Sequence, residues 1–252
     1  MKKFFFIYMM LCAYSFHAQQ TIYDEATVLY KKELRGGIEV HGHGIGLFFT
    51  KGYYKSVDNV LEVNVSLVNM KSPNEDRRFN FWDDRARSYI YGKMNHFYLL
   101  RPSIGKRQLF AYKDRKSGVE FSYSWAIGPS FGITKPYFLE IAVPIDQSRR
   151  ILVKEKYDPQ EHFLGNIYGR ASWFNGFSEL KGYVGAYGKL GFNMEFSREQ
   201  TAIQGIEAGI ALDAFPDEIP ILADETFSGV VNKNKGLFFS FYARLFLGKK
   251  YN

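Results

Sequence analysis

Two histidines separated by one glycine, His41 and His43, are the residues whose types and spacing most readily suggest chemistry. On an extended strand both imidazoles would lie on one face, about 6 to 7 Å apart. With a carboxylate such as Glu39 they could bind a metal ion, or one ring could act as a general base toward a serine. The glycines around them equally indicate a strand that bends to close a barrel. No serine or third ligand can be assigned from the sequence, so we predict no catalytic residue, metal or cofactor.

A second candidate set consists of charged residues that alternate with apolar residues along the predicted strands. Its members are Glu62, Glu120, Lys189, Glu195, Glu207 and Arg244. Inside a narrow barrel such charges must be paired, because desolvation costs several kcal/mol per ion. We therefore predict an ion network that fills the lumen, in which at least one of the other glutamates holds Arg244. A path for protons or solutes along the same residues is the alternative.

The stretches that would carry these residues alternate with a period of two, the spacing of a strand whose two faces meet different surroundings. The clearest are 61–67, 119–127, 184–196, 203–213 and 237–248, and the weaker ones are 37–50, 89–101 and 137–143. About eight strands result, an even number, as expected for a membrane barrel whose chain ends lie on one side. We predict loops at 71–88, 105–118 and 146–180. The last is long enough to form a structured cap or a binding surface.

The residues on the polar faces distinguish a soluble barrel or sandwich from a membrane barrel. These faces carry mainly small residues, among them Ser66, Ser122, Ser124, Gly205 and Gly209. A narrow lumen has room for such side chains, whereas a water-facing sheet would carry more Lys, Glu and Thr. Aromatic residues near strand ends fit an interfacial girdle. The prediction is an all-β fold: an antiparallel transmembrane β-barrel of about eight strands with long loops.

The start of the chain predicts export. Two lysines precede the apolar stretch 4–16, which is too short to span a bilayer, and Ala18 offers a small-residue cleavage point. We therefore predict a signal peptide over residues 1–18 and one outer-membrane barrel domain over 19–252. The single cysteine, Cys12, lies inside the predicted signal, so the mature chain would have no disulfide.

Composition and charge agree with this compartment. Hydrophobic residues make up 46% of the chain and aromatic residues 18%, yet no mature segment could form a helical span. Without the two lysines of the signal, the formal charge of +7 becomes about +5. For an exported protein this charge favours contact with acidic outer-membrane lipids or lipopolysaccharide, and excludes nucleic acid as the expected partner. Other outer-membrane proteins are further candidate partners.

Three segments resemble small outer-membrane β-barrel proteins of Bacteroidota, a family without an assigned activity. They are 89–95 (YIYGKMN), 128–137 (GPSFGITKPY), and 212–216 (LDAFP) with Ile219-Pro220. The signal ending in Ala-Gln-Gln and the aromatic last strand carry the same resemblance. It implies an outer-membrane location and a barrel fold, and it implies no chemistry.

Three classes of function are compatible with these observations. The first is a non-enzymatic barrel that acts as an accessory or interaction subunit of the cell envelope. The second is a lipid-modifying barrel enzyme that uses His41 or His43, and the third is a small selective channel. Phosphate-loop, zinc-cluster and GxSxG motifs are absent from the sequence. The first class is our prediction, and the other two remain as alternatives.

Overall fold

The computed structural model describes residues 30–80, 83–113, 118–146, 149–197, 199, 201–224 and 234–252. The predicted signal peptide and Cys12 lie outside the described residues. Within the described ranges, no helix is long and apolar enough to cross a membrane.

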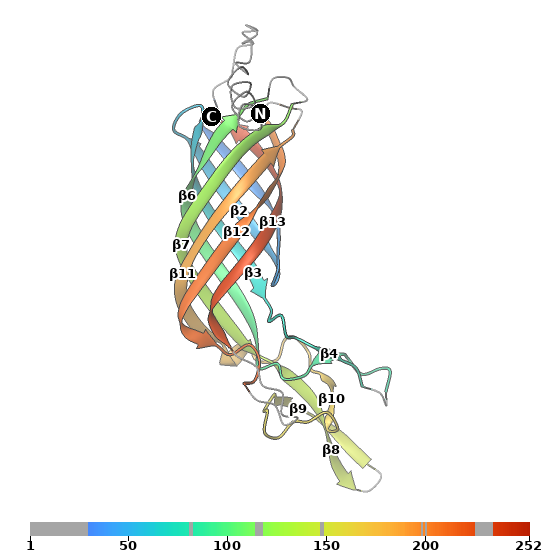
Figure 1. Ribbon diagram of the computed structural model, residues 1–252. Coiled ribbons are helices and arrows are strands. Elements are labelled where there is room, and N and C mark those ends of the chain that lie inside the picture. The colour runs from blue at the N-terminus through green and yellow to red at the C-terminus, as the bar shows by residue number, and fades with distance from the viewer. Residues whose placement is uncertain are drawn as a thin grey trace, which may run out of the picture.

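Eight antiparallel strands form a closed barrel in the order β1-β13-β12-β11-β7-β6-β3-β2 (Figure 1). Their bounds are β1 Lys32–His41, β2 Gly44–Tyr54, β3 Asn59–Met70, β6 Asn95–Ala111, β7 Glu120–Pro136, β11 Lys181–Glu195, β12 Ala202–Ile219 and β13 Lys235–Tyr251. The first and last strands pair with each other, so the barrel has no free edge. This confirms the predicted all-β fold, an antiparallel barrel of eight strands with long loops.

The two ends of the barrel differ in their connections. At the end where Lys32 pairs with Tyr251, here called the terminus end, short connections join β2 to β3, β6 to β7 and β11 to β12. At the opposite end, here called the loop end, long connections follow β3, β7 and β12 (Figure 1). This is the asymmetry of a membrane barrel with short turns on one side and long loops on the other.

The predicted strand 37–50 is wrong, because this segment is a hairpin. Strand β1 ends at His41 and β2 begins at Gly44, with a turn at Gly42 and His43 between them. Gly44 has a φ of 156° and lies against the backbone of Asn69. A Cβ at this position would overlap the carbonyl oxygen of Asn69, so only glycine fits where the hairpin meets β3.

Two further segments differ from the prediction. The lysine and arginine content of the segment 105–118 predicts a loop, but β6 runs into this segment as far as Ala111. The stretch 137–143 does form a strand, β8 (Phe138–Asp146), but this strand lies outside the barrel. The predicted count of eight barrel strands is correct only because two errors cancel. The segment 37–50 contributes two barrel strands instead of one, and the segment 137–143 contributes none.

A small folded unit, here called the cap, lies at the loop end. It contains a three-stranded sheet of β10 (Ile167–Arg170), β8 and β9 (Arg149–Lys156), and the two-stranded ladder of β4 (Arg77–Arg78) and β5 (Tyr89–Ile90). Tyr89, Tyr137, Leu139, Ile141, Tyr157, Ile167 and Ala223 form its buried core. The long connection 146–180 is thus largely structured, with the short helix η1 (Phe177–Glu179) before β11.

A buried ion pair and backbone pairing hold the connections at the loop end together. Lys93 Nζ lies 2.7 Å from Glu75 Oε1, and both side chains are almost fully buried. Burial lowers the pKa of Lys93 from its ordinary value, although the Glu75 carboxylate opposes this shift. The backbone of Lys93 also pairs with Leu222 in the connection between β12 and β13. The cap core adds Leu139 and Ile141 from the β7–β11 connection, so three connections are joined into one body.

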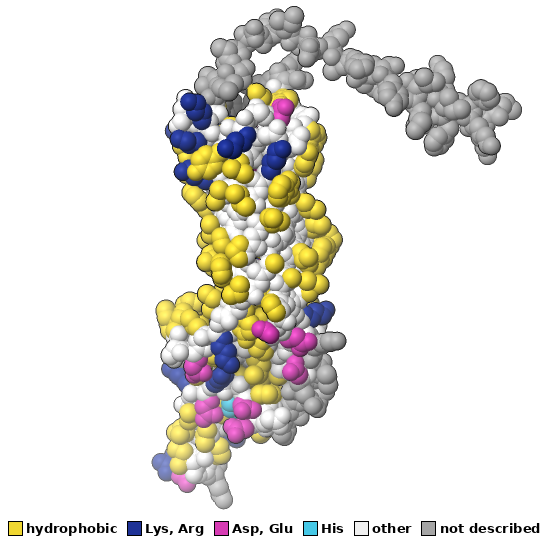
Figure 2. Space-filling model, turned by 90° about the vertical axis from the view of Figure 1, so that its left-hand side faces the viewer, with side chains coloured by type: hydrophobic (Ala, Val, Ile, Leu, Met, Phe, Trp, Pro, Cys, Tyr) yellow, Lys and Arg dark blue, Asp and Glu magenta, His cyan; other side chains and the backbone are white. Residues whose placement is uncertain are grey.

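The barrel wall is apolar outside and polar inside. Along β3, Val63, Val65 and Leu67 are exposed, whereas Glu62, Asn64 and Ser66, which alternate with them, are buried. The other barrel strands repeat this alternation. Figure 2 shows hydrophobic side chains over the middle of one face, with lysine and arginine side chains gathered near the terminus end. This arrangement is the reverse of a soluble barrel.

Candidate functional site

The barrel interior holds a balanced set of charges. Seven carboxylates, from Glu33, Glu39, Glu62, Glu120, Glu195, Glu207 and Asp213, form ion pairs with seven cations, Arg35, Arg101, Arg107, Lys113, Lys189, Arg244 and Lys250. The interior therefore carries no net charge from these groups. These ion pairs form two layers along the barrel axis.

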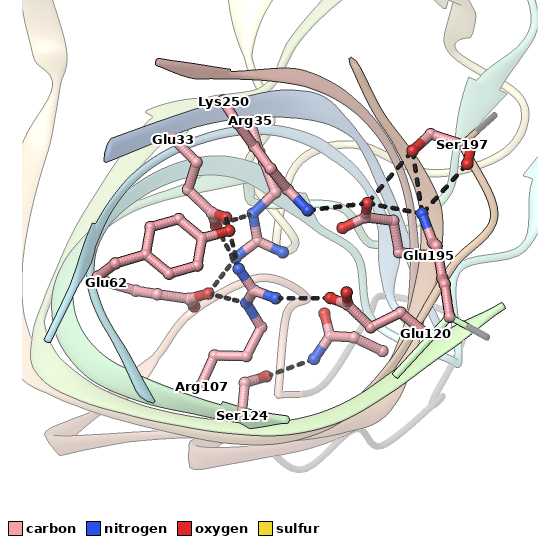
Figure 3. A network of polar contacts seen from close by, with 12 residues as sticks. Glu33, Arg35, Glu62, Arg107, Glu120, Ser124, Glu195, Ser197 and Lys250 are labelled. Atoms are coloured by element: carbon pink, nitrogen blue, oxygen red, sulfur yellow. Dashed lines mark hydrogen bonds and ion pairs between the residues drawn. The ribbon is translucent and has the colours of Figure 1, made fainter. Parts of the chain in front are cut away.

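The first layer lies toward the terminus end and is centred on Arg107 (Figure 3). Its Nη2 donates to both carboxylate oxygens of Glu33, at 2.5 and 2.6 Å, and its Nε donates to Glu62 Oε1 at 2.9 Å. Arg35 contacts the same two carboxylates. Glu120 lies 3.7 Å from Arg107 Nη1. One arginine thus connects strands β1, β3, β6 and β7 across the lumen.

Beside Arg107, Glu195 forms a second centre of the same layer. Its Oε1 accepts from Lys113 Nζ at 3.0 Å and from Lys250 Nζ at 3.2 Å. Lys113 also donates to the carbonyl and hydroxyl oxygens of Ser197, which lies just after the end of β11 (Figure 3). The two lysines come from the β6–β7 connection and from β13. These contacts tie the last barrel strand to the short turns of the terminus end.

The second layer lies deeper and is centred on Glu39, which bridges two arginines. Arg244 Nε donates to Glu39 Oε2 at 2.7 Å, and Arg101 Nη1 donates to Glu39 Oε1 at 3.3 Å. Arg101 also forms a two-bond pair with Asp213, at 2.9 and 2.5 Å. Lys189 Nζ donates to Glu207 Oε1 at 2.6 Å. Charge-assisted pairs with several bonds are the strong form of such contacts.

The six charges selected from the sequence all lie inside the barrel, but in different layers. Lys189, Glu207 and Arg244 come together in the second layer. Glu62, Glu120 and Glu195 belong to the first layer, and they pair with other cations. Glu207 Oε2 lies 3.8 Å from Arg244 Nη1, whereas the principal partner of Arg244 is Glu39.

Sequence reasoning missed the members of the network that lie on β1 and β6. They are Glu33, Arg35, Glu39, Arg101 and Arg107. On β1 the signal was a period of two from Glu33 to His41, which Gly36 and Gly37 obscured. On β6 burial alternates with a period of two through 99–109, but the outward Lys106 and Gln108 break the apolar side of this pattern in the sequence.

An apolar cluster fills the lumen at the loop end. Val68, Met70, Phe97, Leu99, Phe215, Ile219, Ile221, Leu222 and Phe238 form it, and each is at least 92% buried. The rings of Phe97 and Phe215 lie 5.7 Å apart, and Phe238 contacts both. The cluster adjoins the second charged layer, since Arg101 Nη2 lies 3.8 Å from Met70 Sδ. Ion pairs and packed side chains therefore occupy the lumen from one end to the other.

The histidine pair lies at the turn between β1 and β2. The ring centroids are 6.5 Å apart, and the backbone N–H of His43 donates to His41 Nδ1 at 3.3 Å. No serine hydroxyl or carboxylate of the described residues is hydrogen-bonded to either ring. Glu39, the carboxylate considered as a shared metal ligand, is bound to the two arginines instead. In the described part of the chain, no three His, Cys, Asp or Glu side chains are grouped to hold a metal ion.

A group of aromatic side chains lies on the outer wall at the loop end. Trp173 Nε1 donates to the hydroxyl of Tyr98 at 3.2 Å, and Phe177 packs edge-on against Trp173 at 4.8 Å. Phe174 beside them is 78% exposed. Lys135 lies beneath this group, with its Nζ 4.9 Å from the Trp173 ring centroid. Tyrosine and tryptophan at such a level are typical of a membrane–water interface.

A second girdle, of aromatic and basic residues, surrounds the wall at the terminus end. Tyr123 donates to Gln108 Oε1 at 2.6 Å, and Lys51 lies over the Tyr53 ring. Ten residues separate Gln108 from Tyr98 on β6, which is about 33 Å along a strand. At a strand tilt of about 40°, this is about 25 Å along the barrel axis, the height of the apolar band of a membrane barrel.

Comparisons with solved structures find small barrels. The chain is similar to Neisserial surface protein A (10% identity, TM-score 0.41, 87% of this chain and 96% of that chain). It is similar to Ail, the attachment invasion locus protein of Yersinia pestis (8%, 0.40, 88% and 99%), and to the outer membrane protein OprG of Pseudomonas aeruginosa (11%, 0.36, 88% and 96%). No protein-family model and no curated protein sequence matches the chain. The fold assignment rests on the strand pairing given above.

Proposed function

We propose that the protein is an outer-membrane β-barrel whose terminus end faces the periplasm and whose cap faces the exterior. Three observations support this location. The wall is apolar outside and charged inside, aromatic residues border the apolar band at both ends, and the three long connections all lie at one end. Export by residues 1–18 and membership of the Bacteroidota barrels, both predicted from the sequence, are part of this proposal.

Within the outer membrane, we propose a non-enzymatic role as an interaction or accessory subunit of the cell envelope. The observation that carries this role is the contrast between the two parts of the molecule. The lumen is filled by ion pairs and by an apolar cluster, so it offers no route for a solute. The loop end, in contrast, is folded into a cap with its own sheet and core. The barrel serves as an anchor, and the cap presents a surface.

The exposed surface of β9 is the part of the cap best suited to bind a partner. In the described chain, β9 pairs only with β8, so one of its edges is open. Ile151 and Leu152 are 46% and 50% exposed on opposite faces of this strand, next to Arg150 and to Arg149, which is ion-paired with Asp146. Exposed apolar side chains within a basic border fit a protein partner with an acidic rim.

Membrane fractionation tests the location, and co-purification tests the role. The mature protein is expected in outer membranes, with a gel mobility that changes on heating, because a closed barrel resists detergent until heated. Replacing Ile151 and Leu152 with aspartate should abolish partner co-purification from gently solubilised membranes and leave the heat-dependent mobility unchanged. Val57→Asp, at an equally exposed position in a turn of the terminus end, is the matched control. A partner retained by the Ile151/Leu152 variant would contradict the role but not the location.

A further inference from the structure

An open groove lies on the outer wall of the barrel near the terminus end. It has a volume of about 620 Å³ and crosses β3, β6 and β7 beneath the β2–β3 turn. Leu61, Ile104, Trp125 and Ile127 supply its apolar surface. Lys106 pairs in register with both Leu61 and Trp125, so these three residues form one row across the groove.

Two lysines give the groove its charge. Lys106 points outward from β6, and Lys55 belongs to the turn, which closes through a backbone bond from Lys55 N–H to Asn59 O at 2.8 Å. No acidic residue lines the groove, and neither lysine is ion-paired in the described part of the chain. The site thus combines an apolar floor with two unpaired cations on one side.

The charge of the surrounding wall has the same sign. Of the acidic residues in the eight barrel strands, only Asp217 and Glu218 are exposed, and both lie at the loop end of β12. At the terminus end, Lys32, Lys51 and Lys249 face outward. The barrel strands thus bring cations and no exposed carboxylate to this end, and the acidic residue nearest to Lys55 in the turn is the partly buried Asp58, which does not line the groove.

We propose that this groove binds one anionic phospholipid, with its headgroup phosphate between Lys55 and Lys106 and its acyl chains along Leu61, Ile104 and Ile127. The inference rests on the proposed membrane location. In that orientation the terminus end lies in the periplasmic leaflet, which is made of phospholipid, so the occupant is a phospholipid rather than lipopolysaccharide. Lysine suits such a site because its stem packs on apolar surface while its ammonium group reaches the interface.

Trp125 lines the groove and serves as a reporter. In a Trp82→Phe/Trp173→Phe background it is the only tryptophan of the three. The full mature protein is reconstituted in phosphatidylcholine vesicles that contain increasing fractions of brominated phosphatidylglycerol or of brominated phosphatidylcholine. We expect the brominated anionic lipid to quench Trp125 at a much lower mole fraction. Each near-surface lysine raises the affinity for an anionic lipid about fivefold, so two lysines should raise this affinity about 30-fold.

Replacing Lys55 and Lys106 with glutamine should remove this preference and leave quenching by the brominated phosphatidylcholine unchanged. Lys154→Gln/Lys156→Gln, on the cap strand β9, removes the same charge and should keep the preference. Equal quenching by the two lipids in the parent protein would overturn the lipid site and leave the membrane location standing. Absence of quenching by either lipid would overturn the location itself. A preference that survives in the Lys55/Lys106 variant would also overturn the site.

Discussion

Arg244 on the last barrel strand and Glu39 on the first are direct partners across the seam where the barrel closes, and their side chains are hydrogen-bonded inside it. The contact joins residues 205 positions apart in the chain. It forms only when β1 and β13 pair in the observed register, because a shift by one residue would turn one of the two side chains toward the outer face. The pair therefore couples barrel closure to charge neutralisation.

Removing one member of this pair is expected to be costly. Arg244→Met leaves the buried Glu39 carboxylate with Arg101 as its remaining ion-pair partner, and should lower the free energy of unfolding by about 3–5 kcal/mol. The double variant Glu39→Met/Arg244→Met should lose much less. Denaturant titration of the protein folded in phospholipid vesicles measures both values.

The exposed pair Lys156–Glu179 is the matched control for this experiment. Its atoms lie 3.4 Å apart with both side chains nearly half exposed. Breaking it should change stability by less than about 1 kcal/mol. If Arg244→Met were as mild as Lys156→Met, the seam pair would have no special role in closure.

Arginine on the outer wall should be penalised according to depth. Val65 pairs with Phe49 and Pro102, midway between the two girdles, so Val65→Arg should cost about 2–4 kcal/mol in vesicles. Phe192 also faces outward, as the sequence pattern predicts, but it pairs with Tyr123 in the terminus girdle. Phe192→Arg should therefore cost only about 0–1 kcal/mol in electrostatic penalty. Equal costs at the two positions would show that the apolar band is placed wrongly.

The filled lumen predicts that the protein does not conduct. In planar bilayers, the purified barrel should give no discrete conductance steps at voltages at which a porin of similar purity does. Alanine at Phe97 and Phe215 should also leave it closed, because both charged layers lie below the apolar cluster. Conductance in the parent protein would favour the channel alternative. Conductance in the double variant alone would show that the apolar cluster is the only seal.

The sequence was informative where a strand has an unbroken alternation. On β13, Phe239, Phe241 and Leu245 face outward and Arg244 faces inward, as the pattern predicts. The pattern failed where glycines or outward lysines interrupt it. Lys106 lies on the outer face, so the second half of β6 resembles a basic loop in the sequence. Lys106 lines the groove near the membrane interface, and a period of two in the sequence does not predict such a position.

Partner choice inside the lumen was the least predictable feature. The sequence shows which side chains face inward, but ion pairing depends on strand order and stagger around the closed barrel. Glu39 illustrates this, because its proximity in sequence to His41 suggested a metal site. Barrel closure instead brings Arg101 and Arg244 to it from β6 and β13. The cap sheet was unpredictable for the same reason, since β8 and a barrel strand have similar alternation.

The last prediction concerns Arg101, whose planar guanidinium group has partners both at its nitrogen atoms and on its face. Its Nε and Nη2 bind Asp213, its Nη1 binds Glu39, and it lies 4.9 Å from the centroid of the Tyr187 ring. A lysine keeps the charge, but its single ammonium group cannot reach both carboxylates in the same geometry. Arg101→Lys should therefore lower the free energy of unfolding by about 2–3 kcal/mol, because hydrogen bonds to charged groups are worth about 1.5–3 kcal/mol.

Ser130 provides the graded comparison for Arg101. Its hydroxyl donates to Asp213 Oδ1 at 2.8 Å, the oxygen that also accepts from Arg101 Nε. Ser130→Ala removes one neutral donor and leaves both ion pairs in place, so it should cost about 1 kcal/mol. If the carboxylate pairs fix the barrel, the order of destabilisation is Arg101→Met, then Arg101→Lys, then Ser130→Ala. An Arg101→Lys variant as stable as the parent would mean that charge alone suffices, and that the two-bond geometry at Asp213 contributes nothing to closure.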